Sequence, residues 1–182
     1  TASVEWMLTW RDSVAAHGRS ADGFNTYYMY WPDGDFANFR LRFATALATG
    51  ASIGVQYEGS SQNDHTPRLD EYDVDLGAPT SEPFWVRAGV LGRKFEKGEV
   101  YANGNGGVEL IPLDRTVWRI AGKQDSIVNN GQAERGAFFL PLQDGIVLLY
   151  QENNAPDEFR LLSPPDSTIF TAIDSVNLSW SK

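Results

Sequence analysis

The first third of the chain switches repeatedly between two hydrophobic periods. Residues 4–14 repeat apolar side chains at helical spacing, and residues 24–31, FNTYYMYW, are an aromatic run of strand length. Helical spacing returns over residues 36–47 behind Asp35, a residue suited to cap a helix, and residues 51–58, ASIGVQYE, predict a second strand. The order helix, strand, helix, strand with short joins is typical of a parallel α/β sheet or barrel.

After about residue 84 the helical period disappears. Residues 89–113 alternate short apolar runs with a Lys97-Gly98 turn and a glycine-rich turn, and three further short apolar runs follow: TVWRIAG, AFFLPL and DGIVLLYQ. Short strands separated by turns predict an antiparallel β-sandwich over residues 84–150. Residues 151–167 are rich in Asn, Pro, Asp and Ser, a composition typical of a linker.

Two α/β units are too few to close a parallel sheet that is covered on both faces. We therefore predict that residues 1–83 are the last βα units of a (β/α)8 barrel, and that the chain is a fragment with both ends cut. The missing barrel portion or a neighbouring subunit is the expected protein partner. Residues 151–182 are predicted to contain the linker and the start of a further module.

Net charge, cysteine content and the length of apolar runs exclude several classes of function. A formal charge of −9 over 182 residues argues against nucleic acid as a partner, because phosphates demand a basic surface. The absence of cysteine excludes disulfides and thiolate metal sites. No apolar run is long enough to span a bilayer.

Several motifs occur in an order that resembles the C-terminal portion of bacterial glycoside-hydrolase-like (β/α)8-barrel proteins with a trailing β-sandwich. The motifs are RLRFATALATGASIGVQYE, DEYDVDLGAP, RKFEKGEVYANG, VNNGQ and LPLQDGIVLL, which together cover roughly residues 36–150. Asn103-Gly104 stands where that group usually has Asn-Pro. The tail, residues 163–182, resembles the first strands of a fibronectin type III or immunoglobulin-like module.

This resemblance implies a secreted or cell-surface protein that acts on a polysaccharide or oligosaccharide by acid/base hydrolysis of glycosidic bonds, without a cofactor. The alternative is a non-catalytic structural or carbohydrate-binding subunit of an extracellular assembly. Acids at the ends of earlier barrel strands would separate the two.

The candidate catalytic residues are Glu58, at the end of the second strand, and Asp70 and Glu71 in the acidic segment that follows. Glycosidases need two carboxyl groups flanking the bond, and strand ends in a barrel point toward its mouth. An ordinary loop-entry glutamate is the plain alternative for Glu58.

The candidate substrate-binding residues are Trp31, Asp33 and Tyr57. Sugar rings present apolar C–H faces that stack on aromatic side chains. The plain alternative is that these aromatics pack beneath helices.

The segment RLDEYDVDLGAP, residues 68–79, concentrates four carboxylates in six positions. Three interpretations remain open: a structural turn, a substrate contact, and a calcium site, although the acids lack the spacing of a recognisable calcium loop. No metal site is expected elsewhere, since His17 and His65 have no partner spacing. The glycine-rich residues 104–107 lie between strands and do not open a helix, so they are no phosphate cradle.

Overall fold

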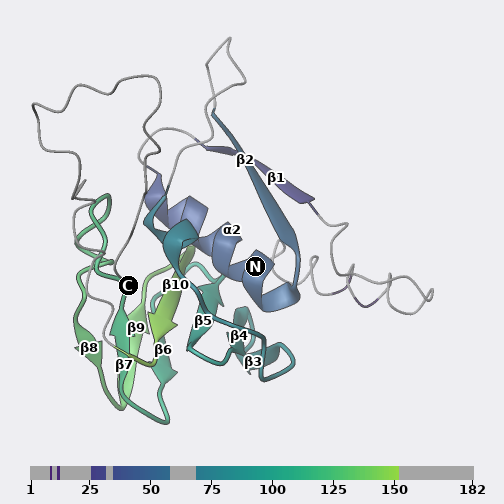
Figure 1. The fold of residues 1–182 in the computed structure, drawn as a ribbon. Helices are drawn as coiled ribbons and strands as arrows, with labels where there is room; N and C mark the ends of the chain where they lie inside the picture. Colours follow the sequence, from purple (N-terminus) through teal and green to yellow (C-terminus); the bar gives the residue numbers. More distant parts are fainter. Residues whose placement is uncertain (1–8, 10–11, 13–25, 32–34, 58–68, 152–182) are drawn as a thin grey trace, which may run out of the picture.

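A computed structural model describes residues 9, 12, 26–31, 35–57 and 69–151 (Figure 1). The elements in the first part are β1 (Thr26–Trp31), α2 (Phe36–Thr49), β2 (Ser52–Tyr57) and the 3-10 turn η1 (Asp70–Asp73). The strands that follow are β3 (Phe84–Arg87), β4 (Val90–Lys94), β5 (Gly98–Asn103), β6 (Glu109–Pro112), β7 (Val117–Arg119), β8 (Ala133–Glu134), β9 (Ala137–Leu140) and β10 (Asp144–Leu149). Of the predicted helix at residues 4–14, the structure describes Thr9 and Asp12, both helical.

The β1–α2–β2 segment forms as its pattern predicts. β1 and β2 pair in parallel, from Thr26 opposite Ser52 to the end of both strands. The Asp35 side chain caps α2 by accepting a hydrogen bond from the Asn38 N–H at 3.1 Å. Gly50 ends the helix in the left-handed conformation, at φ 75°, which glycine adopts without strain.

Residues 84–149 form an open antiparallel sheet in the order β3-β4-β5-β10-β7-β8, and β6 pairs with β9 in a second, two-stranded sheet. α2 packs on one face of the larger sheet, between it and β1–β2, and β6–β9 packs on the other face (Figure 1). Successive side chains of β5 point to opposite faces of the sheet: Val100 and Ala102 face α2, and Tyr101 faces β6–β9.

At Gly145 in β10, the larger sheet lies in close contact with α2. A Cβ atom at this position would lie 2.2 Å from the carbonyl oxygen of Arg40 and 2.8 Å from the Cβ of Ala44. Only glycine allows the helix to lie this close to the strand. One apolar core therefore joins Phe39 of α2 to Val147 of β10.

The prediction that the chain carries the last βα units of a (β/α)8 barrel is wrong, and the resemblance to barrel proteins of the glycoside-hydrolase type is overturned with it. The described residues hold one parallel strand pair, and a mostly antiparallel, β-rich architecture dominates. The barrel prediction failed for a physical reason. A helix between two parallel strands shows the same hydrophobic period in its sequence whether it packs on a barrel or on an antiparallel sheet. The β-rich second part is confirmed and is compatible with the predicted β-sandwich.

No helix among the described residues is long and apolar enough to cross a membrane. The tail that resembles a fibronectin-like module, residues 163–182, lies outside the described residues.

Candidate functional site

The acidic segment is hydrogen-bonded to the loop between β7 and β8. The Asp70 Oδ2 atom accepts hydrogen bonds from the backbone N–H groups of Lys123 and Gln124, at 2.8 and 2.9 Å. The Asp70 N–H donates in return to the Gln124 side chain at 2.9 Å. A Cβ at Gly122 would lie 2.5 Å from Asp70 Oδ2, so the loop fits closely around this carboxylate.

Glu71, the next residue, binds the same β7–β8 loop from a buried position. Its side chain is 5% exposed and accepts a hydrogen bond from Asn129 Nδ2 at 2.8 Å. Burial raises the pKa of the Glu71 carboxyl. Next to it, the Tyr72 ring packs edge-on against Phe39 and Phe43 of α2, with centroids 5.6 and 5.5 Å away. These contacts favour the structural interpretation of the segment; a catalytic role for Asp70 or Glu71 stays a prediction.

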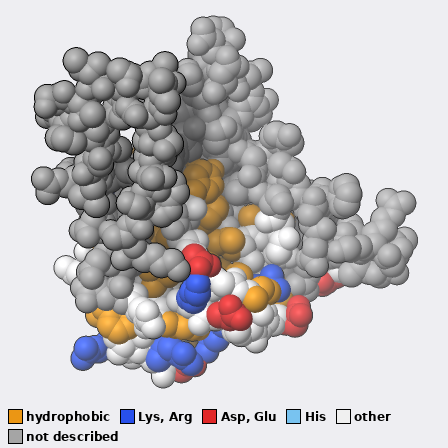
Figure 2. Space-filling view, viewed as in Figure 1, with side chains coloured by type: hydrophobic (Ala, Val, Ile, Leu, Met, Phe, Trp, Pro, Cys, Tyr) orange, Lys and Arg blue, Asp and Glu red, His pale blue; other side chains and the backbone are white. Residues whose placement is uncertain are grey.

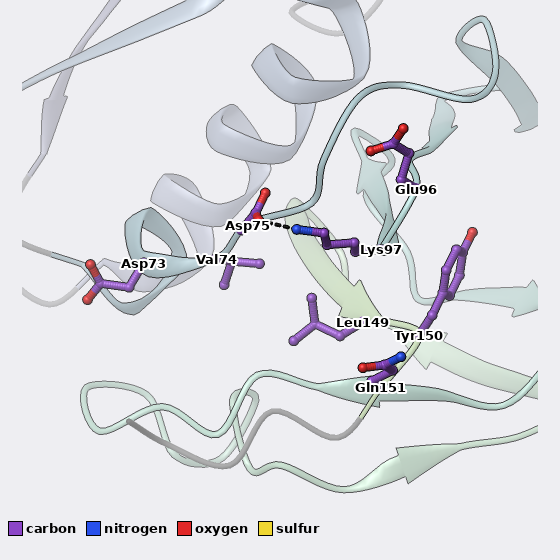
Figure 3. Close-up of a pocket in the computed structure, with 8 residues that line it drawn as sticks. All are labelled: Asp73, Val74, Asp75, Glu96, Lys97, Leu149, Tyr150 and Gln151. Atoms are coloured by element: carbon purple, nitrogen blue, oxygen red, sulfur yellow. Dashed lines mark hydrogen bonds and ion pairs between the residues drawn. The ribbon is translucent and has the colours of Figure 1, made fainter. Parts of the chain in front are cut away.

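Further along the same segment, an open groove of about 450 Å³ lies between the exit of η1, the β4–β5 turn and the end of β10 (Figure 3). Its lining combines carboxylates, one amine, one amide, one aromatic ring and two aliphatic side chains. The residues are Asp73, Val74, Asp75, Glu96, Lys97, Leu149, Tyr150 and Gln151. Figure 3 shows Asp73 and Glu96 toward opposite ends of the groove, with Leu149 and Val74 between them.

An ion pair crosses the middle of the groove. The Lys97 ammonium binds Asp75 Oδ2, and the other carboxylate oxygen of Asp75 accepts the Gly77 N–H at 2.9 Å (Figure 3). The hydrogen bond from Lys97 lowers the pKa of Asp75, so this carboxylate is ionised at neutral pH. Glu96 Oε2 accepts the Ala78 N–H at 3.1 Å, which joins the segment after η1 to the β4–β5 turn.

Directly behind the groove lies a buried acid, Glu99 of β5. Its side chain is 1% exposed, and its Oε1 atom has no hydrogen-bond partner among the described residues. The Tyr150 hydroxyl, 3.4 Å from Oε2, links this acid to the groove. Burial raises the pKa of Glu99, because removal from water disfavours the charged carboxylate. The Arg115 guanidinium covers the Tyr150 ring, 4.4 Å from its centroid.

A second hollow, of about 380 Å³, opens on the side of the β6–β9 layer. Apolar and aromatic side chains line it, and an ion pair between Lys94 Nζ and Asp114 Oδ2, 2.6 Å apart, lies at its wall. The lining residues are Phe84, Val86, Lys94, Tyr101, Pro112, Leu113 and Asp114. Glu99 lies next to this ion pair, because Lys94 is its partner in the β4–β5 register.

The structure places the other predicted site residues only in part. Glu58 and Asp33 lie outside the described residues. Trp31 and Tyr57 are register partners at the ends of β1 and β2, so the parallel pairing brings their backbones together at one edge. Their role as substrate-binding residues stays a prediction.

Neither pocket offers a metal site. Within the described ranges, no group of three or more His, Cys, Asp or Glu side chains is placed to hold a metal ion. Charged side chains of both signs are interspersed on the described face of the molecule (Figure 2), without a broad field of one sign to attract a polyelectrolyte.

Comparison with known proteins does not assign the chain to a family. No protein-family model matches the chain, and neither the curated proteins nor the solved structures contain a significant match.

Proposed function

We propose that this protein is a non-catalytic carbohydrate-binding module, and that an uncharged polysaccharide or oligosaccharide binds in the groove between Asp73 and Glu96. The observation that supports the proposal most directly is the mixed lining of this groove. The aliphatic side chains of Val74 and Leu149 lie between hydrogen-bonding groups at the two ends.

Sugars have both kinds of surface that this lining would meet. Their hydroxyl groups donate hydrogen bonds to carboxylates, and the groove presents two exposed carboxylates, those of Asp73 and Glu96. Their C–H faces pack against apolar and aromatic side chains such as Leu149 and Tyr150. The groove is open, and an open shape suits a chain that continues beyond the binding site.

Charge restricts the class of sugar. The lining carries three carboxylates against one ammonium group, that of Lys97, which is already paired with Asp75. The whole chain is also acidic, at −9. An anionic polysaccharide would meet repulsion here, so a neutral one is proposed. A polysaccharide ligand agrees with a secreted or cell-surface location, which is part of the proposal.

Binding is favoured over hydrolysis because the two predicted catalytic acids that the structure describes, Asp70 and Glu71, already have partners within the fold. Hydrolysis needs two carboxyl groups free to flank a glycosidic bond. Asp70 is occupied by two backbone N–H groups and Glu71 is buried against Asn129, so neither faces an open cavity as a free carboxyl.

Affinity electrophoresis of the whole chain through gels containing neutral or acidic polysaccharides tests the proposal. We expect retardation by at least one neutral polysaccharide and none by an acidic one. Asp73→Asn should weaken binding about fivefold, since it removes the charge from one hydrogen bond, and Gln151→Ala by a similar factor.

The matched control is Glu82→Gln, which makes the same charge change at an exposed glutamate outside the groove lining. Its retardation should equal that of the unmodified chain. Migration unaffected by every neutral polysaccharide, or equal effects of Asp73→Asn and Glu82→Gln, would contradict the proposal.

A further inference from the structure

Lys94 lies within reach of two acids, and the structure pairs it with one of them. Its Nζ atom is 2.6 Å from Asp114 Oδ2, in the connection between β6 and β7. In the antiparallel register of β4 and β5, Lys94 is directly opposite Glu99. Cβ atoms of directly opposite residues lie about 4.5–5.5 Å apart on the same face of a sheet, so a lysine ammonium can reach either acid.

The two acids differ in their surroundings. The Asp114 side chain is 53% exposed, and the hydrogen bond from Lys94 lowers its pKa, so it is ionised. The Glu99 Oε1 atom is buried without a partner, an arrangement that is tolerable for a neutral carboxylic acid and costly for a carboxylate. Loss of the Glu99 proton would therefore create a buried negative charge, with Lys94 as its partner across the hairpin.

We propose that Lys94, Glu99 and Asp114 form a proton-operated switch. While Glu99 is neutral, Lys94 binds Asp114 and holds the β6–β7 connection, residues 113–116, against the sheet. When Glu99 ionises, the Lys94 ammonium turns to the Glu99 carboxylate and releases Asp114. No other residue need move for the exchange to begin, because a lysine side chain rotates about its own bonds.

The groups around Glu99 determine when the exchange occurs. The positive charge of Lys94 on β4 favours the ionised form of Glu99. The negative charge of Asp114, in the β6–β7 connection, disfavours it. The hydroxyls of Tyr101 on β5 and Tyr150 after β10 favour the ionised form by hydrogen bonding. Two arginines nearby are already paired: Arg119 of β7 with Glu134 at 2.6 Å, and Arg115 Nε with Asp114 Oδ1 at 3.3 Å. Lys94 is the cation that favours the ionised form of Glu99.

Tyr150 connects the switch to the groove of Figure 3. Tyr150 lines that groove, its hydroxyl contacts Glu99, and its ring lies under Arg115, the neighbour of Asp114. Release of the connection would withdraw Arg115 from the ring. The inference does not depend on what the groove binds, and its test needs no ligand.

The test combines two measurements on the whole chain. Carboxyl-selective NMR with ¹³C-labelled glutamate follows the Glu99 titration, identified as the resonance that Glu99→Gln removes. Hydrogen exchange, corrected for its intrinsic pH dependence, follows the amides of residues 113–117. We expect Glu99 to titrate above 4.5, the ordinary pKa of glutamate. These amides should exchange about two- to fivefold faster above that midpoint, the factor expected from losing one exposed ion pair.

Two variants keep the switch falsifiable. Glu99→Gln should keep exchange of residues 113–117 slow on both sides of the midpoint. Asp114→Asn changes an exposed side chain, so the fold should remain; exchange should then be fast at every pH while Glu99 still titrates. Lys123→Met, at an exposed lysine outside both the switch and the groove lining, should retain the behaviour of the unmodified chain. The switch is overturned if Glu99 titrates in the ordinary range, or if exchange in the unmodified chain or in Asp114→Asn does not change as stated.

Discussion

The Arg40 guanidinium of α2 binds the Asp144 carboxylate at the start of β10 with two parallel hydrogen bonds. They run from Nε to Oδ1 at 2.9 Å and from Nη2 to Oδ2 at 2.8 Å, and both side chains are buried. The third nitrogen of Arg40, Nη1, binds Asp125 at 2.5 Å. A bidentate pair fixes orientation as well as distance, so it sets how the helix lies on the sheet.

Breaking this pair should be costly. Asp144→Asn leaves the buried Arg40 charge without its bidentate partner, and we expect a loss of about 3–5 kcal/mol in the free energy of unfolding. Urea denaturation measures it. Asp114→Asn, which removes the acid of an exposed ion pair, should cost less than about 1 kcal/mol. Similar losses in the two variants would show that Arg40–Asp144 does not hold the helix.

The close approach at Gly145 gives a second prediction. Gly145→Ala places a methyl group against the Arg40 carbonyl and Ala44, so we expect destabilisation of about 1–3 kcal/mol or more from overpacking. At Gly106 an added Cβ would meet nothing within 4 Å. Gly106→Ala is therefore the matched control and should change stability little. Thermal unfolding of both variants decides the point, and equal midpoints would contradict the helix position.

Asp70 should prove to be a loop anchor. Asp70→Ala leaves the N–H groups of Lys123 and Gln124 without their acceptor, and we expect a loss of about 1–3 kcal/mol in stability. Exchange of these two amides should become faster. Asp70→Asn keeps an oxygen acceptor and should recover most of the loss. If Asp70→Ala left both stability and amide exchange unchanged, the structural role would be wrong.

Stability should depend on pH through Glu99. Its pKa is raised in the folded chain above the ordinary value of 4.5, so from about pH 4.5 upward the unfolded chain loses this proton before the folded chain does. The folded state then binds more protons, and its stability falls with rising pH until the folded pKa is passed, by up to about 1.4 kcal/mol per pH unit. Denaturation curves across this range should show a shallower decline in Glu99→Gln. An identical pH dependence in both chains would rule out a raised pKa.

The local elements of this fold are predictable from sequence because their signals are local. Asp35 and Gly50 mark the two ends of α2, and the alternation around the Lys97-Gly98 turn predicts the β4–β5 hairpin. The surface on which α2 packs is not predictable in the same way. That packing depends on Gly145, about a hundred positions away, and a strand glycine equally marks a bulge or a sharp bend.

The candidate sites were missed for a related reason. Glu99 carries a weak sequence signal, because it is an acid at a strand position whose i+2 neighbour is Tyr101, a residue that faces a core. Its importance depends on partners, namely Lys94 across the hairpin and Tyr150 at the end of β10. The acids of residues 70–73 are conspicuous in the sequence because they are closely spaced, but their hydrogen-bond partners lie in a loop more than fifty positions later.

The most direct test of the central claim is to map the binding surface on the folded chain. An oligosaccharide cut from the polysaccharide that retards the protein would be titrated into uniformly ¹⁵N-labelled chain, and amide shifts recorded by NMR. We expect the largest shifts at residues 73–75, 96–98 and 149–151, which border the groove. Shifts gathered instead on the exposed outer face of β6–β9, around Leu110 and Phe139, or no shifts at saturating ligand, would contradict a carbohydrate site in the groove.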